Sequence, residues 1–132
     1  MKRLHGLAAA VICVCLAGTA AAQSGNRVSM LRGLDKVTGR ISTFEAPVNQ
    51  AVRFGALEII VRHCMKRPPE EPPETSAFLE ISEIKPDDEP VLLFSGWMFA
   101  SSPALSALEH AVYDVWVIDC TTAAPETPSG NE

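Results

Sequence analysis

Two cysteines, Cys64 and Cys120, have the clearest chemistry of the residues that follow position 22. Exported proteins with two cysteines most often join them, and the bond would close a loop of more than fifty residues. In the chain-entropy treatment this stabilises a fold by about 4 kcal/mol. The alternative is a metal site that also uses His63 and His110. Structural zinc sites pair their ligands at short spacings such as C-x-x-C, which neither cysteine has, so the spacing favours a disulfide.

Hydrolytic chemistry would need a serine nucleophile, and two serines could take part. Ser95 lies in Phe-Ser-Gly-Trp, which is not the G-x-S-x-G nucleophile motif. Ser95 or Ser101 could form a triad with His110 and Asp114, but triads are recognised by geometry, which a sequence does not give. We assign no catalytic residue, and a small periplasmic hydrolase remains the alternative function.

Acidic residues are paired in two proline-flanked turns, at 70–71 and at 87–88. General-acid chemistry requires burial, which such turns do not provide. Calcium loops require oxygen ligands at alternating positions and a glycine, which 87–89 lack. Asp35 precedes a turn, where an aspartate normally accepts hydrogen bonds from nearby backbone amides. We therefore expect no metal site and no cofactor.

Aromatic side chains could line a ligand groove, but aromatics at strand spacing are more often part of the core. The residues concerned are Phe94, Trp97, Phe99, Tyr113 and Trp116. We expect them to be core residues.

A proline-rich segment occupies residues 66–75, with the sequence KRPPEEPPET. Its four prolines lack amide donors and bias their predecessors to extended geometry, so it is a stiff surface loop with polyproline character. A stiff loop loses little entropy on binding and therefore suits a protein partner, although a simple spacer would look the same. The candidate contact residues are Lys66, Arg67, Pro68, Pro69, Glu70, Glu71, Pro72 and Pro73.

The first 22 residues have the features of a secretory signal peptide. Lys2 and Arg3 precede an uncharged run over 7–16, and Ala20 and Ala22 form the A-x-A pattern of a cleavage site. We expect cleavage after Ala22, an exported or periplasmic protein, and no stable membrane insertion after cleavage. The expected divisions are a signal peptide over 1–22, a flexible segment over 23–29, a β domain over 30–120 and a disordered tail over 121–132.

The charge of the chain restricts its partners. It has 11 Lys and Arg against 16 Asp and Glu, and removal of Lys2 and Arg3 leaves 9 against 16, a net charge of −7. An acidic surface repels phosphate backbones, so we expect no nucleic-acid partner.

Period-2 runs and closely spaced turn residues predict an all-β fold. Gly39 can supply the positive φ of a hairpin turn. The expected strands cover 30–35, 40–45, 52–64, 76–84, 91–100 and 111–120, with one short helix near 103–109. We predict a small sandwich or partly closed barrel of about 5–7 strands with one short helix, closed by the disulfide.

Two motifs resemble a known bacterial family. They are LRGLDKVTGR at 31–40 and LLFSGWMFASSPALSALEHAVYDVWVIDC at 92–120, together with the cysteine that precedes the proline-rich loop. This pattern is similar to the domain of unknown function 2155. The resemblance implies a small secreted envelope protein whose family has no assigned activity, so it provides no catalytic residue. Our leading hypothesis is a non-enzymatic module that binds an envelope protein or takes part in assembly.

Overall fold

Seven β-strands make up most of the described part of this computed structural model, which covers residues 27–106, 108 and 110–122. The strands are β1 (Arg27–Asp35), β2 (Arg40–Pro47), β3 (Ala51–Phe54), β4 (Leu57–Lys66), β5 (Thr75–Glu83), β6 (Val91–Phe99) and β7 (Tyr113–Thr122). The all-β prediction is confirmed. The predicted signal peptide and the residues from 123 onward lie outside the described part of the chain.

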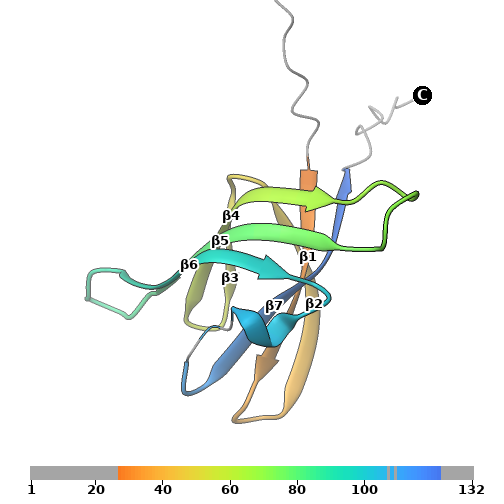
Figure 1. Cartoon of the computed structure of the whole chain (residues 1–132). Coiled ribbons are helices and arrows are strands. Elements are labelled where there is room, and N and C mark those ends of the chain that lie inside the picture. The colour runs from red at the N-terminus through yellow and green to blue at the C-terminus, as the bar shows by residue number, and fades with distance from the viewer. Residues whose placement is uncertain (1–26, 107, 109, 123–132) are drawn as a thin grey trace, which may run out of the picture.

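The strands form two antiparallel sheets that pack face to face as a sandwich (Figure 1). One sheet has the order β2-β1-β7 and the other has the order β3-β4-β5-β6. Figure 1 shows β1, β2 and β7 crossing behind β4, β5 and β6 at a steep angle, as in orthogonally packed sheets. Of the two architectures that the sequence left open, the sandwich is the one observed.

The first hairpin forms where the sequence predicts it. The Oδ1 atom of Asp35 accepts hydrogen bonds from the N–H groups of Val37 at 2.9 Å and Thr38 at 3.2 Å. Gly39 then takes a φ of 68°, which a side chain would disfavour. Asp35 is therefore a turn residue, as expected.

The single strand expected over 52–64 is wrong, because the chain reverses within it. Gly55 has a φ of 56°, and Phe54 pairs with Leu57, so a two-residue turn separates β3 from β4. The turn is hidden in the sequence because the residues on both sides of Gly55 favour strands.

The first strand begins three residues before position 30, where the sequence predicts the β domain to start. β1 begins at Arg27, because Val28 and Ser29 are buried and the Arg27 guanidinium donates to the Cys64 carbonyl oxygen at 2.8 Å. At the other end β7 continues to Thr122, which pairs with Arg27. Residues 23–29 are mostly polar, but Val28 among them is buried.

In place of the short helix expected near 103–109, the described residues of that stretch contain a three-residue 3-10 turn, η1 (Pro103–Leu105). The Ser102 side chain makes no capping bond, and the turn is closed by a backbone bond from Leu105 N to Ser102 O at 3.1 Å. A helix of so few residues forms too few hydrogen bonds to offset the unfavourable free energy of nucleation. No helix among the described residues is long and apolar enough to cross a membrane.

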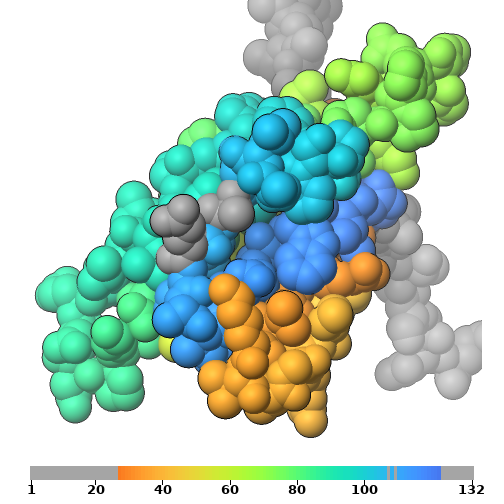
Figure 2. All heavy atoms as spheres, turned by 60° about the horizontal axis from the view of Figure 1, so that its bottom comes forward, coloured from red at the N-terminus to blue at the C-terminus, as the bar shows by residue number. Residues whose placement is uncertain are grey.

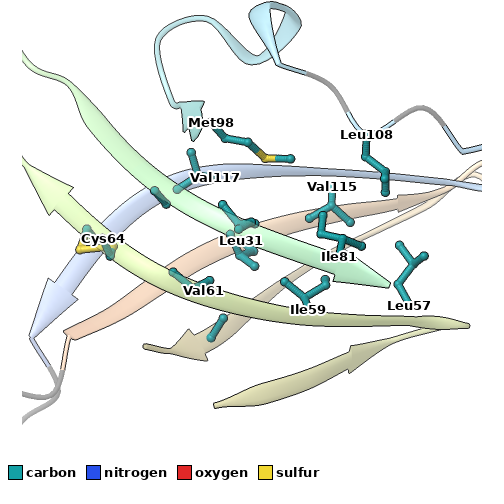
Figure 3. Packing of buried hydrophobic residues seen from close by; sticks show 14 residues of the cluster. Leu31, Leu57, Ile59, Val61, Cys64, Ile81, Met98, Leu108, Val115 and Val117 are labelled. Carbon is teal, nitrogen blue, oxygen red and sulfur yellow. A yellow bond between two sulfur atoms is a disulfide. The ribbon is translucent and has the colours of Figure 1, made fainter. Parts of the chain in front are cut away.

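The core lies between the two sheets and takes side chains from both (Figure 3). On β4 the alternating residues Leu57, Ile59 and Val61 are fully buried, as their spacing predicts. The register of β4 against β5 then shifts between Val61 and His63. This bulge turns Cys64 inward, where only 2% of it is exposed, and leaves His63 on the outer face.

Candidate functional site

The disulfide joins the two sheets at one end of the sandwich. Cys64 of β4 and Cys120 of β7 are bonded across a sequence separation of 56, with a Cα–Cα distance of 5.8 Å. The predicted pairing is confirmed. The metal alternative is wrong, because the two sulfur atoms are bonded to each other and the His63 ring stacks on Trp97 instead.

An ion pair fixes the start of the proline-rich loop beside the disulfide. Lys66 Nζ lies 2.8 Å from Asp119 Oδ1, and the same oxygen accepts the Cys120 N–H at 2.8 Å. The hydrogen bond from Lys66 and that from the Cys120 backbone lower the pKa of Asp119 below its ordinary value of 3.8, while partial burial opposes this shift. The carboxylate is therefore held in its charged form next to the bridge.

The other end of the loop is fixed by Glu74. Its carboxylate accepts hydrogen bonds from the Ser101 hydroxyl, the Ser101 N–H at 3.1 Å and the Thr75 N–H at 3.0 Å. The bonds from Ser101, with a smaller contribution from Thr75, lower the pKa of Glu74 below its ordinary value of 4.5. Backbone bonds within the loop, from Arg67 N to Glu74 O and from Glu71 N to Pro68 O, are both 3.0 Å long. The loop is closed on itself and attached at both ends.

A hollow opens on the outer face of the four-stranded sheet, between this loop and η1. Its floor is a row of three residues in register across β4, β5 and β6, namely Met65, Ser76 and Phe99. Ser76 is the smallest of the three, so the row is lowest in the middle. Figure 2 shows the loop, in green, projecting from the body of the molecule.

We call this feature the outer hollow, with a volume of about 490 Å³. It is lined by Met65, Lys66, Arg67, Pro68, Glu71, Glu74, Ser76, Phe99, Ser102 and Leu105. Met65 is 54% exposed and Leu105 is 75% exposed, so its apolar surface is open to solvent. Four of the eight predicted contact residues, Lys66, Arg67, Pro68 and Glu71, line it.

A second row of residues continues the apolar surface along the same strands. His63, Phe78 and Trp97 are in register, two positions from the floor of the outer hollow. The Trp97 ring centroid lies 6.1 Å from that of His63 in a stacked arrangement and 5.6 Å from that of Phe78 edge-on. We call these three residues the aromatic row.

The expectation that the aromatic residues are core is correct for two of them and wrong for three. Tyr113 and Phe94 pack against the buried cluster, whereas Trp97, Phe99 and Trp116 do not belong to it. Strand alternation explains the difference, because Trp97 and Phe99 flank the buried Met98, and Trp116 flanks the buried Val115 and Val117. The alternation about Met98 was the sequence signal that could have identified this exposed face.

The side chains of the hydrolase alternative bond to other partners and not to one another. Ser101 is bonded to the loop carboxylate, and Ser95 is exposed on β6. His110 accepts two backbone N–H groups through Nδ1, at 3.0 and 3.2 Å. Asp114 pairs with Lys36 at 2.8 Å. The structure therefore does not bring these side chains together as a nucleophile, a base and its orienting acid.

The other acidic candidates lie in exposed turns. Asp87 has a φ of 63°, and Asp88 N lies 3.4 Å from the Lys85 carbonyl oxygen. Among the described residues, no three His, Cys, Asp or Glu side chains are grouped as a metal site would require.

Residues 29–120 identify the family of this chain. These residues match the sequence model of a family described as an uncharacterized protein conserved in bacteria, DUF2155. The chain belongs to this family. A relative of this DUF2155 chain is an uncharacterized protein of Rickettsia prowazekii (strain Madrid E), 32% identical over 87 residues, which cover 66% of this chain and 56% of the relative. The chain thus spans little more than half the length of that relative. No solved structure matches this chain.

The two motifs that resemble DUF2155 pair along β1 and β7, from Leu31 opposite Val117 to Asp35 opposite Tyr113, which lie at the end of the sandwich away from the disulfide. There Phe54 of β3 lies directly over Gly33, and a Cβ atom built on Gly33 would be 2.5 Å from Cζ of Phe54. The Phe54 ring stacks on Phe44 at 5.3 Å and meets Tyr113 edge-on at 5.6 Å. Gly33 is therefore a packing residue of this DUF2155 chain.

Proposed function

We propose that this chain is an exported bacterial envelope protein whose domain binds a segment of another protein in the outer hollow. The observation that carries the proposal is the exposed apolar surface of Met65 and Leu105 between a fixed loop and η1. Apolar surface left open in a concave site is typical of ligand and protein contacts. Its volume of about 490 Å³ lies within the roughly 300–1,000 Å³ range of binding pockets.

The fixed walls support binding as the role of this site. The loop is closed by its own backbone bonds and attached through Glu74 and Lys66, so little conformational freedom is lost when a partner binds. Catalysis would require a nucleophile and a base within hydrogen-bond reach. The serine that adjoins the site, Ser101, is bonded to a carboxylate that fixes the loop.

Export is supported by the sequence of the first 22 residues and by the disulfide, since disulfides persist mainly in oxidising compartments. Intact mass measurement of the protein from the envelope fraction tests this proposal. We expect a chain that begins at Gln23. A chain that still begins at Met1, or one recovered from the cytoplasm with Cys64 and Cys120 as free thiols, would contradict it.

Binding in the outer hollow is tested by placing a photo-cross-linking amino acid at Ser102, on the rim of the hollow. Val37, which is 77% exposed in the first hairpin turn, is the matched control position. We expect a defined adduct in intact cells from position 102, none from position 37, and less adduct when Leu105→Ser is added. The same adducts from both positions, or none from position 102, would exclude the outer hollow as the contact surface.

A further inference from the structure

The charges that line the outer hollow indicate what kind of segment it would accept, provided that the proposed function holds. Four charged side chains line it: Lys66, Arg67, Glu71 and Glu74. Lys66 is paired with Asp119, and the carboxylate of Glu74 is occupied by its bonds to Ser101 and Thr75, with the Arg67 charge close enough to help lower its pKa. Within the described part of the chain, no ion pair or side-chain hydrogen bond compensates Glu71. Its neighbour Glu70 is exposed beside it.

An uncompensated carboxylate on the rim favours a cation in the partner. Lys66 and Arg67 are the cations of this region, and Glu70, Glu71, Glu74 and Asp119 are its carboxylates, so a bound Lys or Arg would meet a net negative rim. The charge of the mature chain, −7, acts in the same direction at long range and disfavours a second copy of this chain as the occupant.

The distance between the two apolar rows determines how the apolar residues of a bound segment must be spaced. The floor of the hollow and the aromatic row are two residues apart on the same strands, which is about 7 Å. An extended segment has the same rise over two residues, with both side chains on one side. One apolar side chain can therefore contact Met65, Phe99 and Leu105 while the second, two positions away, lies on Trp97.

We propose that the outer hollow binds an extended polypeptide segment with two apolar residues in the pattern apolar-x-apolar, and with Lys or Arg next to the apolar residue that enters the hollow. That residue occupies the hollow, the second apolar residue lies on the aromatic row, and the cation faces Glu70 and Glu71. The segment runs along the strands of the four-stranded sheet.

Amidated hexapeptides are the probes that test this proposal. The sequence Lys-Lys-Leu-Thr-Phe-Thr and its reverse have the required pattern in the two chain directions. One control replaces both Lys by Glu, and a second, Lys-Lys-Leu-Phe-Thr-Thr, keeps the composition but changes the spacing. The Trp116→Phe variant leaves Trp97 as the only tryptophan, so its fluorescence reports on the aromatic row, and amide chemical shifts locate the bound peptide.

We expect one of the two directions to bind with shifts at Met65, Ser76 and Trp97, and about three- to tenfold more tightly than the Glu peptide at low salt. The preference for Lys should disappear in the double variant Glu70→Gln with Glu71→Gln, while binding itself remains. The peptide with changed spacing should bind more weakly than the original.

Equal affinity of the Lys and Glu peptides, equal affinity of the two spacings, or no shifts at these residues would overturn the proposed segment. Shifts that appear with protein concentration alone would show that a second copy covers this face, which would also overturn it. If the peptides fail while the adduct at position 102 persists, the proposed binding function stands and only the chemistry of the segment is wrong. If both fail, the proposed function is wrong as well.

Discussion

The two ends of the sandwich connect the same sheets by different means. At the disulfide end, defined by Cys64, Cys120 and the loop that follows β4, a covalent bond joins β4 to β7. At the aromatic end, defined by Gly33, Phe54 and Tyr113, ring packing does so. The three rings Phe44, Phe54 and Tyr113 pack against one another and against the buried cluster, whereas Met65 at the disulfide end is exposed on the outer face of its sheet. One end thus relies on a covalent bond and the other on packed rings, and the outer hollow lies beside the covalent end.

Breaking the disulfide should have the largest effect on stability. We expect Cys120→Ser to lower the free energy of unfolding by about 4 kcal/mol, because the unfolded chain regains the freedom of a long loop. Denaturant unfolding measures this. Cys64→Ser and wild type under reducing conditions should show nearly the same loss, and a loss below about 1 kcal/mol in all three would show that the disulfide end is maintained by packing alone.

Crowding the aromatic end should have the next largest effect. We expect Gly33→Ala to cost about 1–3 kcal/mol, because the new methyl group meets the Phe54 ring, which Phe44 and Tyr113 hold in place. In a Phe54→Leu background the same change should cost much less. If the cost is equal in both backgrounds, the contact between Gly33 and the ring does not determine the packing of this end.

Removing the attachment of the loop should have a smaller and pH-dependent effect. The pKa of Glu74 is lowered in the folded protein, so its contribution to stability is present above about pH 4.5 and is lost as the pH falls through its folded pKa. Glu74→Gln should therefore be less stable than wild type at neutral pH, and the difference should vanish in acid. Because the group is exposed, added salt should reduce the effect. A stability difference that does not depend on pH would show that Glu74 acts through packing and not through its charge.

Changing the apolar wall of the outer hollow should leave stability almost unchanged. Leu105 is 75% exposed, so Leu105→Ser should alter the free energy of unfolding by no more than about 0.5 kcal/mol. Val37→Ser, at a residue that is 77% exposed at the other end, is the matched control. Only the change at Leu105 should reduce cross-linking from position 102. Equal loss with both variants would remove the functional contrast between the two ends.

The sequence predicted those features that depend on residue type and local order. Asp35 and Gly39 determine a hairpin turn through their own backbone preferences, and two cysteines after position 22 leave one intramolecular pairing. The alternation of Leu57, Ile59 and Val61 identified the buried face of β4.

Features that depend on register between strands were not predictable in this way. The bulge after Val61 inverts the side on which Cys64 lies, and it exists only in the pairing of β4 with β5. The floor of the outer hollow likewise requires Met65, Ser76 and Phe99 to come side by side from three strands. Each of the three looks ordinary in its own strand. The proline-rich loop was recognised from composition, but its attachment through Glu74 to Ser101 joins residues 27 positions apart.

The position of the disulfide also determines how the domain responds to mechanical tension. Arg27 and Thr122 pair at the same end of the sandwich, where Figure 1 shows β1 beginning and β7 ending. A force that separates these ends opens the β1–β7 ladder one pair at a time and reaches Cys120 after two pairs. From there the bond to Cys64 carries the load, so the backbone between the two cysteines, which includes the proline-rich loop and η1, is bypassed. An oxidised chain can be stretched only through the strands that precede Cys64, whereas a reduced chain extends along its whole length.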